Sequence, residues 1–426
     1  MNLYIKSLPY SLLCAFLMLF PDPILAQPET VPNEHPVTTG SQMRFPMEQT
    51  SSAPSHAEGI LGRYFPNLHG TEALHFDYVY NGGVFNNARG GAQTRNGTVY
   101  NGCFEIGITA DTEKLGLWRN GTFFMHSFFS HGPSPSRFVG DYQGVSVFGY
   151  ETPAQVGEYW YMHELFDGVL TIKGGKQDAG ADFFFLESTA DFINSSTTLV
   201  PTAGMPSIPD NAWGIAGFLD LTDHFCLKAG VYDARPNGNK FWMSESGDVY
   251  SIYQAEYHYR LFRHLPGFVY LGGWYDSSKT ESLTQPGRWR TGRFGFSMGF
   301  EQMIYRHNIC DKEDMRGLIF FVQYSEGGRN RHAELKGFWA LGFQWLGLFE
   351  PRPDDIAGFA VNTVRFSDGF RASEDLTYGQ ERAYEIYYKI QLTENVTLQP
   401  VFQYVVHPSG TYRNSFVPGL VFQTVF

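Results

Sequence analysis

Charged side chains gather around three glycine-containing segments of the sequence. "TIKGGKQDAG" brings Lys173, Lys176 and Asp178 close together, while "GLWRNG" and "VYDARPNG" each contain an arginine. Guanidinium, ammonium and carboxylate groups bind the hydroxyls of polar solutes, and rings of such groups make a narrow passage selective. We therefore expect the residues that contact a solute or form a constriction among Arg119, Asn120, Glu164, Lys173, Lys176, Asp178, Asn194, Asp233 and Arg235.

Each of these segments also has a purely structural interpretation. Asn120-Gly121 suits a tight turn that requires positive φ, with Trp118 as an anchor at a membrane interface. The charges of "TIKGGKQDAG" suit a solvated strand that ends in a glycine turn. Asp233 and Arg235 suit a salt-linked turn. The sequence leaves both interpretations open for all three segments.

The sequence does not predict a catalytic or metal site. "GFSMG" (295–299) matches the G-x-S-x-G pattern formally, but that motif needs a helix after the serine, and here aromatic residues alternate with small ones. His163 lacks the second histidine of a zinc-binding helix. The three cysteines that follow Cys14 are widely spaced and odd in number, which excludes a complete disulfide framework. We expect no catalytic residue, no metal and no cofactor.

Apolar and polar residues alternate with a period of two along much of the chain, which predicts strands. "YQAEYHYRL" (253–261) places tyrosines on one face, and "FGFSMGFE" (294–301) and "AYEIYYKIQL" (383–392) repeat the pattern. Polar connectors rich in Gly, Pro and Asn separate the runs. The polar face supplies the candidates for a lumen wall, which are Glu256, Arg260, Glu385, Lys389 and Gln399.

Composition and the N-terminus narrow the class of protein. The 426 residues carry a formal charge of −12, which argues against nucleic-acid binding, and 17% of them are aromatic. Residues 1–26 have a basic start, a short apolar core and a small residue at Ala26, which predicts a secretory signal peptide. Residues 27–58 are rich in Pro, Ser, Thr and Gln and predict a flexible leader, followed by a β domain at 59–426.

Two environments fit such strands, a soluble β-sandwich and an outer-membrane barrel. Tyrosines near strand ends are typical of the aromatic girdles at lipid interfaces, and the last strand ends on the aromatic Phe426. Val421 and Val425 interrupt the alternation of that strand. We predict an all-β, transmembrane, antiparallel up-and-down barrel in the bacterial outer membrane, in contact with lipid, whose C-terminal Phe426 is recognised by the barrel-assembly machinery.

Six segments, in order, resemble the carbohydrate-selective porins of the OprB type. They are "LHFDYVYNGGVFNN" (74–87), "TVYNGCFEIGITADTEKLGLWRNGTFF" (98–124), "ELFDGVLTIKGGKQDAGADF" (164–183), "ADFINSS" (190–196), "GVYDARPNG" (230–238) and "VTLQPVFQYVVHPSG" (396–410). The chain departs from the family at "VVHPSG", where asparagine more often precedes the proline, and before Gly59. The resemblance implies sixteen strands and a narrow, sugar-preferring channel.

The expected function is passive, carbohydrate-selective diffusion of mono- or short oligosaccharides into the periplasm. An inward-folded loop would narrow the lumen, where charged groups bind hydroxyls and aromatic rings stack on sugars. A general or ion-selective porin has the same architecture and stays open as a second reading of the sequence. An outer-membrane barrel enzyme and a secreted β-sandwich lectin would also fit parts of the pattern. The sequence does not distinguish a monomer from a homo-oligomer.

Overall fold

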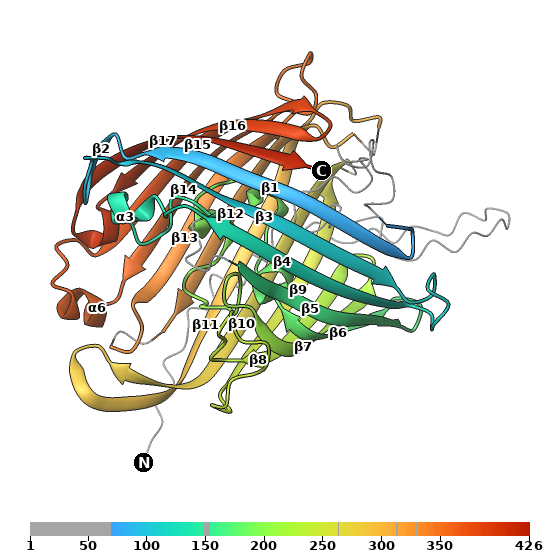
Figure 1. Cartoon of the computed structure of the whole chain (residues 1–426), viewed down its shortest axis with the longest axis horizontal. Coiled ribbons are helices and arrows are strands. Elements are labelled where there is room, and N and C mark those ends of the chain that lie inside the picture. The colour runs from blue at the N-terminus through green and yellow to red at the C-terminus, as the bar shows by residue number, and fades with distance from the viewer. Residues whose placement is uncertain (1–69, 149–153, 263, 312–313, 329–330) are drawn as a thin grey trace. The chain divides into compact units, whose positions relative to one another are not determined.

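The computed structural model describes residues 70–148, 154–262, 264–311, 314–328 and 331–426. Within these ranges nearly all regular structure is β, and the strands close into one barrel (Figure 1). The predicted signal peptide and leader lie outside the described residues. None of the helices in the described ranges is long and apolar enough to cross a membrane.

The strands run from 8 to 22 residues, apart from one of three residues. Membrane-spanning strands need about 9–11 residues, so most of them are long enough to cross a bilayer. The elements are β1 (Leu74–Asn86), β2 (Arg89–Gly91), β3 (Thr98–Asp111), β4 (Gly121–His131), α3 (Ser136–Val139), β5 (Ala154–Leu165), β6 (Leu170–Gln177), α4 (Ala179–Asp182), η1 (Glu187–Thr189), α5 (Ser195–Thr198), β7 (Ala212–Thr222), β8 (Phe225–Asp233), β9 (Val249–Leu261), β10 (Leu265–Ser282), β11 (Gln285–Arg306), β12 (Gly317–Gly327), β13 (Leu335–Leu346), β14 (Ile356–Phe366), α6 (Asp368–Ser373), β15 (Gln380–Thr393), β16 (Val396–Val406), η2 (Pro408–Gly410) and β17 (Arg413–Val425).

Every long strand pairs antiparallel with the next long strand along the chain, and β17 returns to β1 to close the barrel. The closing register runs from Val79 opposite Val425 to Phe85 opposite Gly419. The short β2 continues β1 after a break and pairs only with the first residues of β17. The predicted barrel of sixteen strands is therefore confirmed, with β2 as one additional short strand.

The two ends of the barrel differ in the length of their connections. At the end where β1 begins and β17 finishes, residues 223–224 join β7 to β8 and residues 394–395 join β15 to β16. At the other end, residues 178–211 connect β6 to β7 and residues 367–379 connect β14 to β15. Outer-membrane barrels have short periplasmic turns and long extracellular loops. The long-loop end is accordingly the extracellular end.

The alternation expected from the sequence separates an outer face from an inner one. On β11 the side chains of Phe294, Phe296 and Met298 are 40–55% exposed on the outer wall, while Ser297 is fully buried. On β17, Val421 and Val425 are buried because their parity faces inward, where Val421 joins the same apolar cluster as Phe85. The valines that interrupt the sequence pattern therefore belong to a part of the inner wall that packs against apolar side chains and does not face water.

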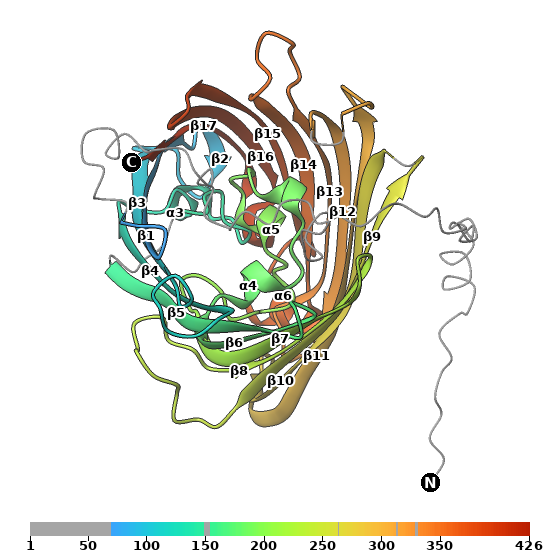
Figure 2. The ribbon, with the colours of Figure 1, turned by 90° about the vertical axis from the view of Figure 1, so that its right-hand side faces the viewer.

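The connection between β6 and β7 folds into the barrel, and Figure 2 shows its helices α4 and α5 inside the ring of strands. We call residues 178–211 the inward segment. Its aromatic side chains pack against the inner wall: Phe184 stacks on Tyr270 of β10, and Phe192 meets Tyr387 of β15 edge-on. This packing fills one side of the barrel and narrows the lumen.

Candidate functional site

The inward segment is held by polar side chains that project from β15. The Glu385 carboxylate accepts hydrogen bonds from the backbone N–H groups of Ile193 (2.7 Å) and Asn194 (2.8 Å). Further along the same face of the strand, the Lys389 ammonium contacts the Asp191 carboxylate at 2.8 Å. Charge-assisted hydrogen bonds of this kind are about twice as strong as neutral ones. Wall residues of β15 thus fix the position of residues 191–194.

Neighbouring strands add neutral donors to the same part of the segment. Gln344 donates to the Asp191 carboxylate, and Gln399 donates to the Asp191 carbonyl oxygen, both at 2.8 Å. Asn194 is the N-cap of α5 and donates to Gln403 at 3.2 Å. Glu385, Lys389 and Gln399, which the sequence offered as candidates for a lumen wall, thus contact the inward segment and not an open lumen.

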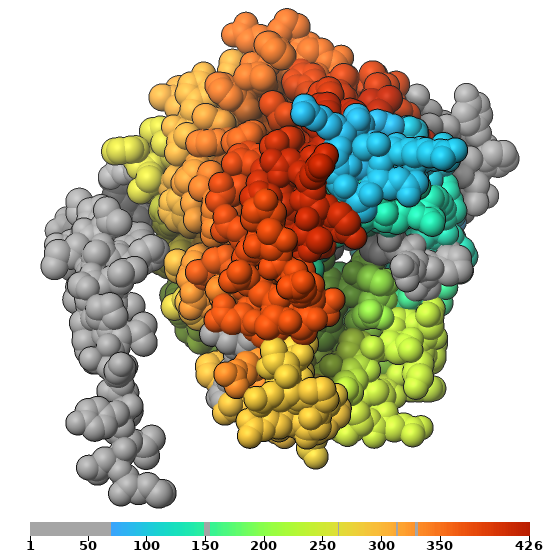
Figure 3. Space-filling model, turned by 90° about the vertical axis from the view of Figure 1, so that its left-hand side faces the viewer, coloured from blue at the N-terminus to red at the C-terminus, as the bar shows by residue number. Residues whose placement is uncertain are grey.

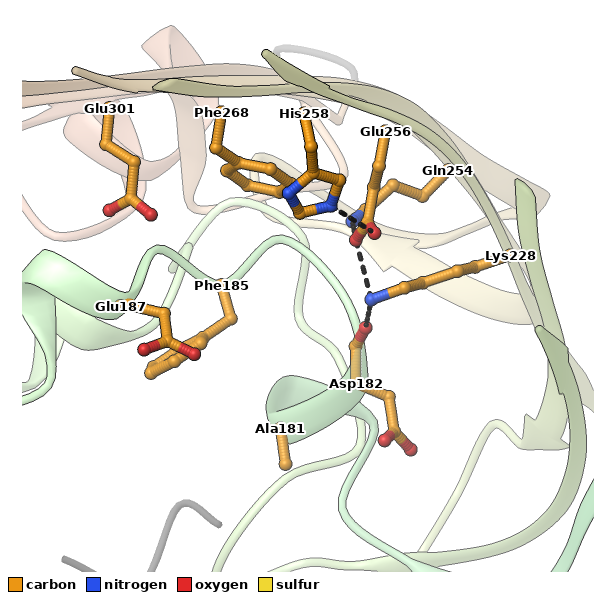
Figure 4. Close-up of a pocket in the computed structure, with 10 residues that line it drawn as sticks. All are labelled: Ala181, Asp182, Phe185, Glu187, Lys228, Gln254, Glu256, His258, Phe268 and Glu301. Carbon is orange, nitrogen blue, oxygen red and sulfur yellow. Dashed lines mark hydrogen bonds and ion pairs between the residues drawn. The ribbon is translucent and has the colours of Figure 1, made fainter. Parts of the chain in front are cut away.

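A second anchoring region lies between α4 and strands β8–β11 (Figure 4). The Lys228 ammonium contacts the Glu256 carboxylate at 2.6 Å and donates to the backbone carbonyl of Asp182 at 3.1 Å. On β11, Glu301 accepts hydrogen bonds from the backbone N–H and the hydroxyl of Ser188. The hollow between these groups has a volume of about 40 Å³, room for a few waters and too small for a sugar ring. Glu256 is thus part of an anchor.

The inner faces of β4 and β5 carry aromatic rings that remain partly exposed, and the buried Lys173 of β6 lies beside them. Phe124 and Trp160 are cross-strand partners whose ring centroids lie 4.9 Å apart, and both are half-buried. The Lys173 ammonium lies 4.7 Å from the centre of the Trp160 ring and forms a 2.7 Å ion pair with Asp182 of α4. We call Phe124, Trp160, Lys173 and Asp182 the aromatic–ionic cluster.

Hydrogen-bonded polar groups extend this surface onto β1 and β3. Glu105 accepts from Asn81 at 2.9 Å and contacts His126 at 3.1 Å. The His126 ring stacks on Phe124 with a centroid distance of 6.4 Å. Polar groups that accept and donate hydrogen bonds therefore border the aromatic rings, which is the arrangement that a sugar needs, because its hydroxyls lie in the ring plane and its C–H groups on the ring faces.

Asp178 lies where β6 enters the inward segment. Its carboxylate caps α4 by accepting from the Gly180 N–H at 2.7 Å, and its own N–H donates to Glu158 at 3.0 Å. Burial, and then the nearby Glu158 carboxylate, raise the pKa of Asp178 to about 6. The base of the segment therefore contains a carboxyl group whose pKa lies above its usual range.

A second connection, between β4 and β5, also reaches the inner wall. Glu381 of β15 accepts hydrogen bonds from the N–H groups of Tyr142 (2.8 Å) and Gln143 (3.0 Å). Burial raises the pKa of the neighbouring Asp141. Figure 3 looks onto the long-loop end and shows a narrow opening where red, teal and green residues meet. The two connections together restrict access to the lumen from this end.

Arg119 and Asn120 occupy the turn between β3 and β4 at the short-turn end. The Arg119 side chain is 85% exposed and pairs with Glu113 at 3.4 Å, and Asn120 has a φ of 60°. Trp118 donates to the Tyr161 hydroxyl on the outer face. The structure thus contains the tight turn, with Trp118 as its anchor at the membrane interface, and neither Arg119 nor Asn120 approaches the inward segment. Glu164 and Arg260 belong to the inward-facing parity near the same end.

Lys176 does not face the lumen. It is three positions after the inward-facing Lys173, so the pleat of β6 directs it to the outer wall, opposite Tyr159. Its ammonium donates to the carbonyls of Val156 (3.1 Å) and Gly238 (2.7 Å). The expectation that Lys176 lines a constriction is not met by this geometry.

Asp233 and Arg235 form a turn outside the lumen. Asp233 accepts from the backbone N–H groups of Arg235 (3.0 Å) and Ser244 (2.5 Å). Arg235 pairs with Asp248 at 2.6 Å. This is the salt-linked turn that the sequence left open as the structural interpretation.

Sequence reasoning missed Phe124, Trp160, Glu105, His126 and Asp182. A signal for them was present, because Phe124 and His126 share the parity opposite to the outward Phe123 and Met125. An aromatic residue on the inward parity is the pattern that could have located the cluster. The contacts themselves join strands and a loop that are far apart in sequence.

A closed antiparallel barrel with an outward apolar face, a polar inner face and an inward-folded segment defines a porin of the bacterial outer membrane. A family model described as "Carbohydrate-selective porin, OprB family" matches residues 95–426, and the chain belongs to this family. Porin B of Pseudomonas aeruginosa is 24% identical over 401 residues, which cover 82% of this chain and 87% of that protein.

Solved structures agree with this fold. The high-pH structure of Pseudomonas putida OprB superposes with a TM-score of 0.77 at 21% identity, covering 88% of this chain and 99% of that one. The low-pH structure of the same protein gives a TM-score of 0.57 at 19% identity, with 88% and 100% coverage. The protein is a carbohydrate-selective porin integral to the outer membrane.

Proposed function

We propose that the channel passes mono- and short oligosaccharides into the periplasm, and that the aromatic–ionic cluster is where they bind. The observation that carries this proposal is the half-buried pair Phe124 and Trp160, 4.9 Å apart, beside the ion pair of Lys173 and Asp182. Aromatic faces offer an apolar surface for the C–H face of a sugar, and the charged groups satisfy its hydroxyls.

Passage requires weak binding, because a solute that binds tightly blocks the channel. The Lys173 ammonium already has a carboxylate partner and an aromatic face, so it offers a hydroxyl only its remaining donor capacity. Likewise, Glu105 already accepts from Asn81. Because part of their hydrogen-bonding capacity is already used, these groups bind a neutral solute weakly and release it. With a permeating ion, the Lys173 ammonium and the Glu105 carboxylate act in opposite senses, since each attracts the ion of opposite charge and repels the ion of like charge.

The test is ion conductance of the purified protein in a planar lipid bilayer, with glucose, maltose or a longer maltooligosaccharide added to one side. We expect reversible, concentration-dependent blocking by the sugars. A large conductance that is indifferent to all three would favour the general or ion-selective porin instead. A sugar-free buffer, brought to the same viscosity with a polymer too large to enter the channel, separates blocking from slower ion diffusion.

Catalysis forms no part of the proposed function. Ser297 is fully buried on β11 and shares a hydrogen bond with the Tyr270 hydroxyl at 3.1 Å. A hydrolase screen of the protein beside its Ser297→Ala variant should give equal, background rates. Activity that disappears in the variant would identify an enzyme.

Export and assembly complete the proposal. Residues 1–26 would be removed as a signal peptide, residues 27–58 would form a leader, and the barrel-assembly machinery would recognise Phe426. Deletion of Phe426 should reduce the heat-modifiable, folded fraction in outer membranes, and N-terminal sequencing of the mature protein should begin at Gln27. The oligomeric state would follow from the mass of the detergent-solubilised protein.

A further inference from the structure

A groove of about 730 Å³ lies at the long-loop end of the barrel, where β2, β16 and β17 meet. In Figure 3 the blue residues of the N-terminal strands adjoin the red C-terminal strands at this end. The groove is separate from the lumen cluster in both position and residues. Its lining includes Arg89, Tyr404, His407, Tyr412, Arg413 and Phe416.

The groove continues the lipid-facing wall. Tyr404 of β16 lies opposite Phe416 of β17, which in turn lies opposite Arg89 of β2, so three outward side chains stand side by side. Further down the same strands, Phe402 and Leu420 are 47% and 44% exposed on the same face. The apolar part of a molecule in the groove would therefore contact the same acyl layer as these side chains.

The charge of the groove is positive and uncompensated. Arg89 and Arg413 are both exposed, and among the described residues neither forms an ion pair, nor does a carboxylate line the groove. Another exposed arginine of the chain does pair, Arg235 with Asp248 at 2.6 Å. Two guanidinium groups that form no ion pair with any described residue, in a chain of net charge −12, indicate an anionic ligand.

Aromatic side chains surround the two arginines. Tyr378 stacks on His407 with centroids 3.5 Å apart, and Asn414 donates to the Tyr404 hydroxyl at 3.0 Å. Tyrosines at this height belong to the interface between head groups and acyl chains. The groove thus combines phosphate-binding cations, rings and hydroxyls for sugars, and an apolar floor.

We propose that the groove binds the phosphorylated sugar head group of a glycolipid in the outer leaflet of the membrane. Arg89 and Arg413 bind its phosphate in bidentate fashion, and the tyrosines contact its sugar rings. A second copy of this chain fits less well, because it would have to present an acidic side chain to the two arginines from within the lipid layer. This assignment concerns the lipid around the barrel and is independent of the solute that the channel carries.

The experiment measures lipid bound to the intact, detergent-purified barrel by native mass spectrometry. The probes are diphosphorylated lipid A, its dephosphorylated form and inorganic phosphate. The variants are Arg89→Ala with Arg413→Ala, and Arg119→Ala as the control, because Arg119 is an 85% exposed arginine at the opposite end of the barrel. Heat modifiability on unboiled gels verifies that each variant is folded.

We expect one tightly bound diphosphorylated lipid A, a loss of affinity of about tenfold or more in the double variant, and no loss in the Arg119→Ala control. Dephosphorylated lipid should bind about as weakly to the natural protein as the phosphorylated lipid does to the variant. Equal binding by the natural protein and the double variant would overturn the proposal. So would full competition by inorganic phosphate, or a change of oligomeric state in the double variant with unchanged lipid binding.

Discussion

Lys389 of β15 and Asp191 of the inward segment form an ion pair of 2.8 Å inside the barrel, with 15% and 14% of their side chains exposed. The wall strand and the loop that it holds are 198 residues apart in sequence at this contact. Lys389 lies in the same row of inward-facing β15 residues as Glu385. The dimensions of the channel therefore depend on contacts between the C-terminal strands and residues 178–211.

Replacing Lys389 by Met should loosen the inward segment, because it leaves the largely buried Asp191 carboxylate without its cation. We expect a loss of about 1–3 kcal/mol in local stability, since the pair keeps some contact with solvent. Conductance traces should become noisier and the mean conductance larger. The double variant with Asp191→Leu should recover part of the loss, and strictly additive effects would contradict a direct interaction.

The variant Glu385→Gln tests the second anchor on β15. An amide has one acceptor oxygen, so only one of the N–H groups of Ile193 and Asn194 keeps its partner, and a buried unsatisfied donor costs about 1–3 kcal/mol. We expect faster protease cleavage within residues 178–211 of the folded barrel. Glu113→Gln is the matched control, because Glu113 is an exposed carboxylate in a turn. Equal cleavage of both variants would contradict the anchoring role.

Trp160 should determine sugar binding in the channel. Trp160→Ala removes the ring that pairs with Phe124, and loss of one aromatic contact corresponds to about 0.5–1.5 kcal/mol, a factor of roughly 2 to 12 in sugar affinity. Ion conductance without sugar should stay the same or rise. Trp118→Ala is the matched control, since Trp118 donates to Tyr161 on the outer face. If maltose blocks the ion conductance of both variants to the same extent, the aromatic–ionic cluster is not the sugar site.

Asp178 should make the stability of the barrel depend on pH. Its pKa is about 6 in the folded protein, because of burial and then the Glu158 carboxylate, and about 3.9 in an unfolded chain. The folded state thus binds the proton more tightly. The stabilisation is complete below pH 4 and is lost as the pH rises through 6, by at most about 3 kcal/mol.

The Asp178→Asn variant, which keeps an acceptor oxygen for the Gly180 N–H, should remove this dependence. We expect its melting temperature at pH 7 to equal or exceed that of the natural protein, and the difference between the two proteins to shrink towards pH 4. Thermal melts followed by circular dichroism in detergent measure both. A difference that grows as the pH falls would show that the sign is wrong.

The alternation of the outer wall was readable from the sequence residue by residue. Tyr404, Phe402 and Phe416 face lipid as their parity required. The reason is physical: each side chain of a barrel strand points either to lipid or to the interior, and the lipid-facing positions require apolar or aromatic side chains. The inward parity of Glu385, Lys389 and Gln399 followed from the same rule.

The inner wall was less predictable, because it has two environments. Where the inward segment packs, the wall carries buried aromatics such as Tyr270 and Tyr387; where the lumen is open, it carries Phe124 and Trp160 beside charges. A period of two does not distinguish these environments. The sequence-based expectation also grouped Lys176 with Lys173, although residues three positions apart on a strand point to opposite faces.

By itself, the sequence determined the class of fold, the order of the strands and the side of the wall on which most residues lie, because those depend on local patterns and on neighbouring strands. Only the tertiary structure decided which inward residues hold the inward segment and which border the open lumen. Asp182 contacts Lys173 of β6 with its carboxylate and Lys228 of β8 with its carbonyl oxygen, and Asp191 meets Lys389 of β15. These contacts depend on the path of a folded loop through the barrel, and no local pattern encodes that path.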